Sequence, residues 1–120
     1  GVDQWHGGVI PDAIKAMEGL AKRHNFEMRW TQEKDFFTCG RFKDFEVLVF
    51  INANPADFAE ADKDAFMKYI RGGGAFAGIH FCSTREEWPW FDGLVGRTFD
   101  HHPKLHALQA WQRYRETPIV

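Results

Sequence analysis

The sequence predicts an α/β fold built from parallel βαβ units. Two amphipathic helical segments alternate with short, strongly apolar runs that are typical of buried strands. A run of three glycines separates the second helical segment from the last apolar run, and glycine allows the tight turn that such a connection needs. Helices that connect strands favour parallel pairing, because the chain must cross back to the same end of the sheet.

The size and composition of the chain predict one globular domain over residues 1–120. Hydrophobic residues make up 44% of the sequence and charged residues 27%, which is enough to build a core and argues against disorder. The net charge of -2 gives no electrostatic reason to expect nucleic acid or an anionic membrane as partner. The longest apolar run, Val47–Ile51, is too short to span a bilayer.

The two cysteines, Cys39 and Cys82, lie far apart in the sequence, and we expect both to be reduced thiols. This favours a cytoplasmic protein. The first ten residues do not have the pattern of a signal peptide. Because the start of the chain looks cropped, a preceding signal sequence stays an open alternative.

The first helix is expected from Pro11 to His24, where apolar residues recur at helical spacing with charged residues between them. Pro11 suits the first turn, because the N–H that it lacks has no partner there. Asn25 is expected to end the helix in the left-handed conformation. The alternating segment Phe26–Trp30 then predicts a strand with one covered face.

The run Phe45–Ile51 is continuously apolar and predicts a central parallel strand covered on both faces. A second helix is expected from Phe58 to Arg71, and the glycines Gly72–Gly74 end it. Ala75–Phe81 is the next expected buried strand, with small residues that permit close packing of helices.

The last part of the chain is less regular. Trp88–Phe91 is expected to begin a short aromatic helix, since proline is tolerated only in a first turn. Leu105–Tyr114 fits both periodicities, and we favour a strand. No strand precedes the first helix, and the chain stops on the apolar pair Ile119–Val120. We therefore expect a fold that is cropped at both ends, with a permuted order of elements as the alternative for the absent first strand.

Several motifs resemble the ThuA-like (trehalose utilisation) family. Tyr69–His80 is similar to a helix end, a glycine run and a strand that closes in Gly-Ile-His. Trp88–Gly96 resembles an aromatic segment that leads into Gly-Leu-Val-Gly, and Phe99–Pro103 resembles a His-Pro signature. Trp5-His6 lies where the family has an aromatic or apolar residue followed by histidine.

The resemblance implies a three-layer α/β/α, flavodoxin-like sandwich with a mostly parallel sheet, within the class I glutamine amidotransferase-like superfamily. It also implies a link to carbohydrate metabolism. In amidotransferase relatives a sharp strand-to-helix turn carries the catalytic cysteine, and His80 stands at that position here. Glutamine amidotransfer is therefore disfavoured, because an imidazole is a poor substitute for a thiolate nucleophile.

Three histidines are candidate site residues. His80 follows a strand whose carboxyl end should border the ligand crevice, where an imidazole can serve as a catalytic acid or base. His6, before Gly7-Gly8, and His102, in the His-Pro motif, are candidate ligand-binding residues at the same edge. The alternatives are a hydrogen-bonded histidine at a strand end for His80 and solvated or capping roles for the others. A nucleophilic Cys82 paired with a histidine is a minor alternative to a buried thiol.

If His6, His80 and His102 converge, their ring nitrogens suit Zn²⁺ or another borderline divalent ion. The chain has no close-spaced metal motif, so this metal site depends on the convergence of the three histidines, and no other cofactor is expected. Trp88 and Trp90 are candidate ligand-binding residues, because the C–H faces of sugars stack on aromatic rings. Packing in the core or against a partner is the favoured alternative for both indoles.

Two function classes remain open. One is an enzyme, or a former enzyme, that acts on a small sugar-like ligand and uses His80 as acid or base. The other is a non-catalytic binding or assembly module that retains the fold. An exposed sheet edge would permit a homo-oligomer in either case.

Overall fold

The computed structural model describes residues 7–33, 36–55, 58–82, 88–97, 99 and 101, and it confirms an α/β fold. Three α-helices and two strands follow one another in these residues: α1 (Ile10–His24), β1 (Val47–Ile51), α2 (Glu60–Arg71), β2 (Ala75–Ile79) and α3 (Pro89–Val95). Short 3-10 turns precede α1 and β1, at Gly7–Val9 and Arg41–Asp44. Within the described residues, no helix is long and apolar enough to cross a bilayer.

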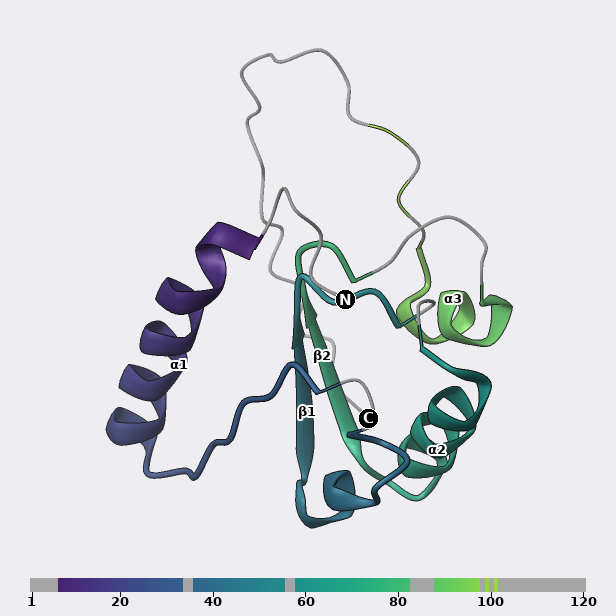
Figure 1. The fold of residues 1–120 in the computed structure, drawn as a ribbon, viewed down its shortest axis with the longest axis horizontal. Helices are drawn as coiled ribbons and strands as arrows, with labels where there is room; N and C mark the ends of the chain where they lie inside the picture. The colour runs from purple at the N-terminus through teal and green to yellow at the C-terminus, as the bar shows by residue number, and fades with distance from the viewer. Residues whose placement is uncertain are drawn as a thin grey trace, which may run out of the picture.

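The two strands form the predicted parallel βαβ unit. β1 and β2 pair in parallel, from Val47 opposite Ala75 to Ile51 opposite Ile79. The helix α2 connects them, and Figure 1 shows it packed beside the sheet. Because the strands are parallel and in register, both carboxyl ends meet at the same edge.

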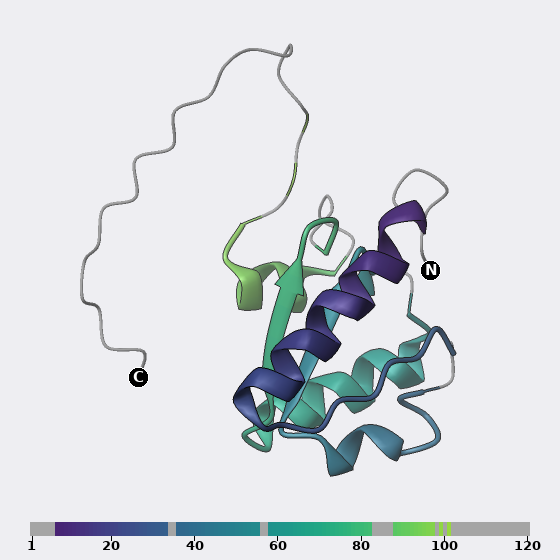
Figure 2. The same cartoon turned by 90° about the vertical axis from the view of Figure 1, so that its left-hand side faces the viewer.

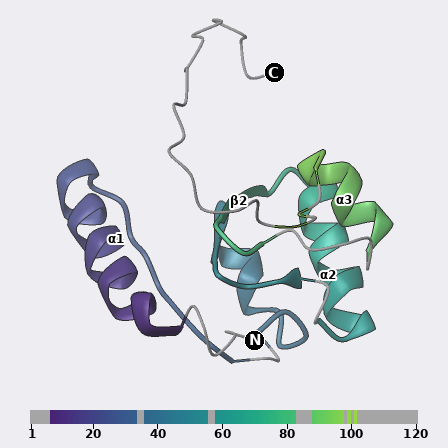
Figure 3. The same ribbon diagram turned by 90° about the horizontal axis from the view of Figure 1, so that it is seen from above.

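The helices lie on both sides of the sheet. α2 and α3 cover one side, and α1 lies on the other (Figure 1), as the view from above also shows (Figure 3). Seen from the side of α1, this helix runs in front of the sheet (Figure 2). The three layers match the predicted flavodoxin-like arrangement.

The core lies between the sheet and the helices α2 and α3. Phe66 of α2 is fully buried, and its ring lies 5.4 Å from that of Phe50 and 5.7 Å from that of Phe76. Phe91 of α3 is 2% exposed and packs on the Phe76 ring at 5.5 Å. Aromatic rings therefore hold β1, β2, α2 and α3 together as one unit.

The run Phe45–Ile51 was predicted to be a strand covered on both faces, and this prediction is wrong for β1. Leu48 and Phe50 face the core, whereas Val47 is 51% and Val49 37% exposed. The reason is that α1 lies on this side without close packing, and none of its residues is buried. The prediction that the second strand is buried is also wrong, because every residue of β2 except Phe76 is exposed. Ile79 of β2 is 47% exposed, and it forms an open apolar sheet face together with the two valines.

The expected strand at Phe26–Trp30 is also not formed. This segment is assigned no regular structure, and Phe26 and Trp30 are 43% and 57% exposed. An alternating pattern becomes a strand only when a neighbour supplies hydrogen-bond partners. The helix before it ends as predicted, because Asn25 adopts the left-handed conformation with φ 55°. The segment Leu105–Tyr114 lies outside the described residues.

Candidate functional site

Two polar residues meet at the carboxyl edge of the sheet. Asn52 directly follows β1, and His80 directly follows β2. The Asn52 backbone N–H donates a hydrogen bond to the Ile79 carbonyl oxygen at 3.1 Å, which ties the two strand ends together. Ligand crevices in open α/β sheets lie beyond such carboxyl ends, so this edge is the candidate site.

Both residues adopt a backbone conformation that L-residues rarely use. The φ angle is 50° at Asn52 and 58° at His80. Asparagine tolerates the left-handed region, and histidine is also enriched there. Such backbone strain tends to persist at functional sites, where the surrounding structure holds it in place. Strand β2 ends at Ile79, two residues earlier than predicted, because the chain turns sharply at His80.

The chain folds back on β2 immediately after His80. A Cβ at Gly78 would lie 3.1 Å from the Cys82 Cβ, so the close return of the chain leaves little room for a side chain there. His80 therefore occupies the tip of a tight turn at a strand end. Its position is the one predicted from the sequence, while its chemical role stays a prediction.

The His80 ring is anchored on one side. Its Nδ1 lies 2.6 Å from the Asn52 side-chain oxygen Oδ1, which is hydrogen-bond distance. Asn52 is only 2% exposed, whereas His80 as a whole is exposed. The arrangement places an accessible imidazole on a buried polar support.

An open cavity of about 480 Å³ borders His80. The residues that line it include the polar residues His80 and Arg97 and the apolar residues Phe76, Leu94 and Val95. The cavity therefore lies along β2 and α3 and combines an apolar wall with groups that can form hydrogen bonds. This combination is typical of small-molecule sites.

Cys82 also lines this cavity but is a poor nucleophile. It is 5% exposed, and its thiol lies within hydrogen-bond reach of the Phe50 and Ile79 carbonyl oxygens, at 3.3 and 3.4 Å. Burial raises the pKa of the Cys82 thiol above its ordinary value. Because the thiolate is the reactive form, these contacts favour the structural alternative for this cysteine.

The predicted aromatic ligand platform is mostly packed against the protein. Trp88 is 9% exposed and stacks on Phe91 with ring centroids 5.6 Å apart. Trp90 is half-buried, and the Arg71 guanidinium lies 6.0 Å from its ring centroid. These contacts favour the packing alternative for Trp88 and leave part of Trp90 accessible.

The other two candidate histidines, His6 and His102, lie outside the described residues. The structure therefore does not place them relative to His80, and their ligand-binding roles stay predictions. In the described part of the chain, no group of three or more histidine, cysteine or acidic side chains lies close enough to hold a metal ion. The proposed zinc site needs all three histidines, so it also stays a prediction.

Sequence reasoning missed Asn52. Neither Asn52 nor Asn54 is among the candidate residues predicted from the sequence, yet both are buried, at 2% and 5% exposure. The available signal was topological. A polar residue directly after one parallel strand meets the residue directly after its neighbour, which here pairs Asn52 with His80.

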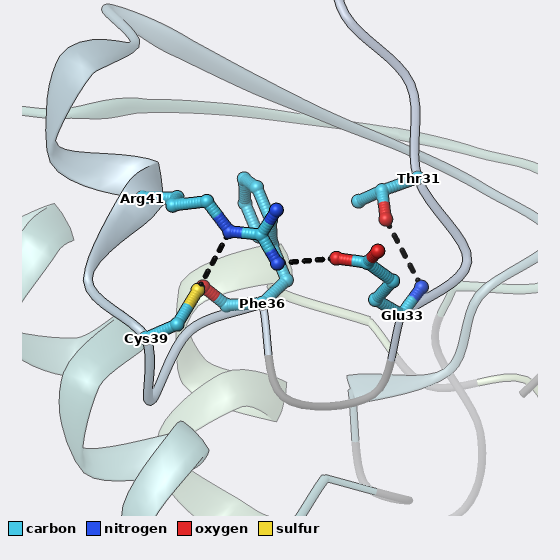
Figure 4. A network of polar contacts seen from close by, with 5 residues as sticks. All are labelled: Thr31, Glu33, Phe36, Cys39 and Arg41. Carbon is cyan, nitrogen blue, oxygen red and sulfur yellow. Dashed lines mark hydrogen bonds and ion pairs between the residues drawn. The ribbon is translucent and has the colours of Figure 1, made fainter.

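A second polar network lies in the segment that leads into β1 (Figure 4). The Cys39 thiol donates to the Phe36 carbonyl oxygen at 2.9 Å, and Arg41 Nε donates to Cys39 Sγ at 3.0 Å. Arg41 also forms an ion pair with Glu33. These hydrogen bonds, first the one to Cys39 and then the one to Glu33, raise the pKa of Arg41. The side chains are exposed, so solvent screens these interactions and they contribute little to stability.

Comparison with known proteins places the chain in a family. Searches of curated proteins and of solved structures found no significant match. A family model described as "ThuA: Trehalose utilisation" matches residues 1–120. The match spans the strand-turn site described above. The chain therefore belongs to the ThuA (trehalose utilisation) family, which is part of the glutamine amidotransferase-like superfamily.

Proposed function

We propose that this protein binds a small sugar-like ligand at the carboxyl edge of its sheet, with His80 as the catalytic acid or base. The observation that carries the proposal is the accessible His80 imidazole, supported by buried Asn52 and bordered by the open cavity. Membership in a trehalose utilisation family supports a carbohydrate as the ligand class.

The chemistry of the cavity suits a sugar. Sugar hydroxyl groups both donate and accept hydrogen bonds, and the imidazole of His80 and the guanidinium of Arg97 offer matching groups. The C–H faces of a sugar ring can pack on the apolar wall that Phe76 and Leu94 contribute. An imidazole nitrogen can accept or donate a proton, so His80 is suited to proton transfer with a hydroxyl group.

The alternative is a non-catalytic binding or assembly module. One observation favours it: the open apolar sheet face formed by Val47, Val49 and Ile79 offers a surface for association. This alternative predicts that loss of the His80 imidazole leaves ligand binding and association unchanged.

Calorimetric titration with trehalose and with methyl α-glucoside tests the proposal. The informative variant is His80→Asn, because asparagine tolerates the positive φ angle of 58° and removes only the imidazole. His24→Asn is the matched control, since His24 is exposed at the end of α1. We expect sugar binding by the wild type and the control and at least a tenfold loss in His80→Asn. Equal binding by both variants, or no sugar binding by the folded wild type, would contradict the proposal.

A further inference from the structure

We propose that Asn52 is a positioning residue that fixes the tautomer of the His80 imidazole. Its amide oxygen holds the proton on Nδ1 and thereby makes Nε2 the proton-accepting nitrogen of the neutral ring. The catalytic consequence rests on the proposed function of His80, but the tautomer is a property of the protein without ligand.

The contact between the two side chains defines the tautomer. Asn52 Oδ1 lies 2.6 Å from His80 Nδ1, and a carbonyl oxygen can only accept a hydrogen bond. With the amide in this orientation Nδ1 is the donor, which requires the proton on that nitrogen. In a neutral imidazole the second nitrogen then carries a lone pair and acts as base or acceptor.

The surroundings of Asn52 hold its amide in place. The residue is 2% exposed, and its backbone N–H is bonded to the Ile79 carbonyl oxygen at 3.1 Å. A buried amide has few orientations that satisfy its hydrogen bonds, so rotation of this side chain is costly. The φ angle of 50° is one that asparagine accepts more readily than most residues.

An amide is chemically suited to this role because it is neutral. A carboxylate at the same place would stabilise the charged imidazolium, so that less of the ring would be in the neutral form that can accept a proton. An apolar side chain would leave the tautomer unset and a ring nitrogen without its buried partner. The amide selects the tautomer without adding charge, as the hydrogen-bond partner of one ring nitrogen does for other functional histidines.

Nitrogen NMR measures this directly. Long-range proton–nitrogen spectra of the whole protein with ¹⁵N-labelled histidine distinguish a protonated ring nitrogen from one with a lone pair. Spectra are recorded without ligand, at a pH where the rings are neutral, and the His80 signals are assigned from His80→Asn. We expect Nδ1 of His80 to be protonated and Nε2 to carry the lone pair. The reverse assignment in the wild type overturns the inference and needs no variant.

Three variants test whether Asn52 is the cause. Asn52→Gly removes the amide and suits the positive φ angle, and we expect the Nδ1 signal to shift towards that of a nitrogen with a lone pair. Asn52→Asp retains an acceptor oxygen and is expected to keep the Nδ1 proton. Asn54→Gly removes another buried asparagine amide nearby and is the control, with no change expected. An unchanged tautomer in Asn52→Gly also overturns the inference.

Sugar binding separates this inference from the proposed function. If Nδ1 is protonated through Asn52 but the wild type binds no trehalose or methyl α-glucoside, the positioning role stands and the proposed function fails. If sugar binds through His80 but the Asn52→Gly tautomer is unchanged, the proposed function stands and the positioning role fails.

Discussion

The ring of Tyr69 occupies the space that a Cβ on Gly74 would need. Tyr69 lies in the last turn of α2, and its hydroxyl oxygen lies 2.8 Å from the Glu46 carbonyl oxygen and 3.3 Å from that of Ala75. One side chain thus joins the helix end to the starts of both strands. This contact helps to set the strand register that brings Asn52 and His80 together at the opposite end.

Gly74→Ala is expected to destabilise the fold by about 1–3 kcal/mol, because the new methyl group must displace a packed aromatic ring. Chemical denaturation of the wild type and the variant at one pH measures the change in the free energy of unfolding. The control is Gly93→Ala in α3, where a Cβ meets open space. That change should stabilise the protein by about 0.4–1 kcal/mol through helix propensity and loss of unfolded-state entropy. Equal effects of the two changes would contradict the packing argument.

Tyr69 also predicts a loss of stability at alkaline pH. Burial raises the pKa of its phenol above the ordinary value of 10.0. The folded state therefore holds the proton more tightly than the unfolded state. This contribution is complete below the unfolded pKa and is lost as pH rises through the folded pKa. Denaturation curves between pH 8 and pH 11, a range that spans the unfolded tyrosine pKa of about 10, measure this effect. The free energy of unfolding should fall less with rising pH in Tyr69→Phe than in the wild type.

The raised pKa of Cys82 adds to the same alkaline loss from its ordinary value of 9.0 upward. The wild type and Tyr69→Phe both contain Cys82, so the difference between their alkaline profiles does not include the contribution of this thiol. A Tyr69→Phe variant with the same alkaline profile as the wild type would show that the phenol does not contribute.

The two thiols are expected to differ in reactivity. Cys39 is exposed, whereas Cys82 is buried and its pKa is raised by burial. We expect iodoacetamide to alkylate Cys39 in the native protein and Cys82 only after denaturation. Peptide mass spectrometry after timed alkylation measures both sites in one sample. Rapid native alkylation of Cys82 would mean that the turn after β2 opens readily.

The backbone at His80 predicts an unusual order of stability. His80→Gly should be more stable than His80→Ala by about 1 kcal/mol, because a Cβ is unfavourable in the left-handed region. Both variants lack the imidazole, so their difference reports on the backbone alone. At the exposed position Glu18 in α1, the alanine variant should be the more stable one by about 1 kcal/mol. The same order at both positions would exclude a strained turn at His80.

The sequence predicted the elements whose signals are local. The periodicity of α1, the left-handed stop at Asn25 and the glycines after α2 each act within a few residues, and all three are present. The parallel pairing of β1 and β2 also followed, because a helix between two apolar runs leaves few other topologies.

Features that depend on distant partners were not predictable in this way. Phe26–Trp30 has the alternation of a strand, but alternation does not supply a neighbouring ladder. Coverage of the second face of β1 depends on how closely α1 packs, which its own periodicity does not determine. The contact between Asn52 and His80 joins residues at the ends of two separate strands, so it can be predicted only when the pairing of these strands is known.

Backbone amide NMR with trehalose as titrant tests the central claim most directly, since it reports where on the protein a sugar binds. The account predicts saturable shifts in the turn from Gly78 to Cys82 and at Asn52, and their loss in His80→Asn. Shifts confined to the network of Glu33, Cys39 and Arg41, or no saturable shift in the folded wild type, would contradict it.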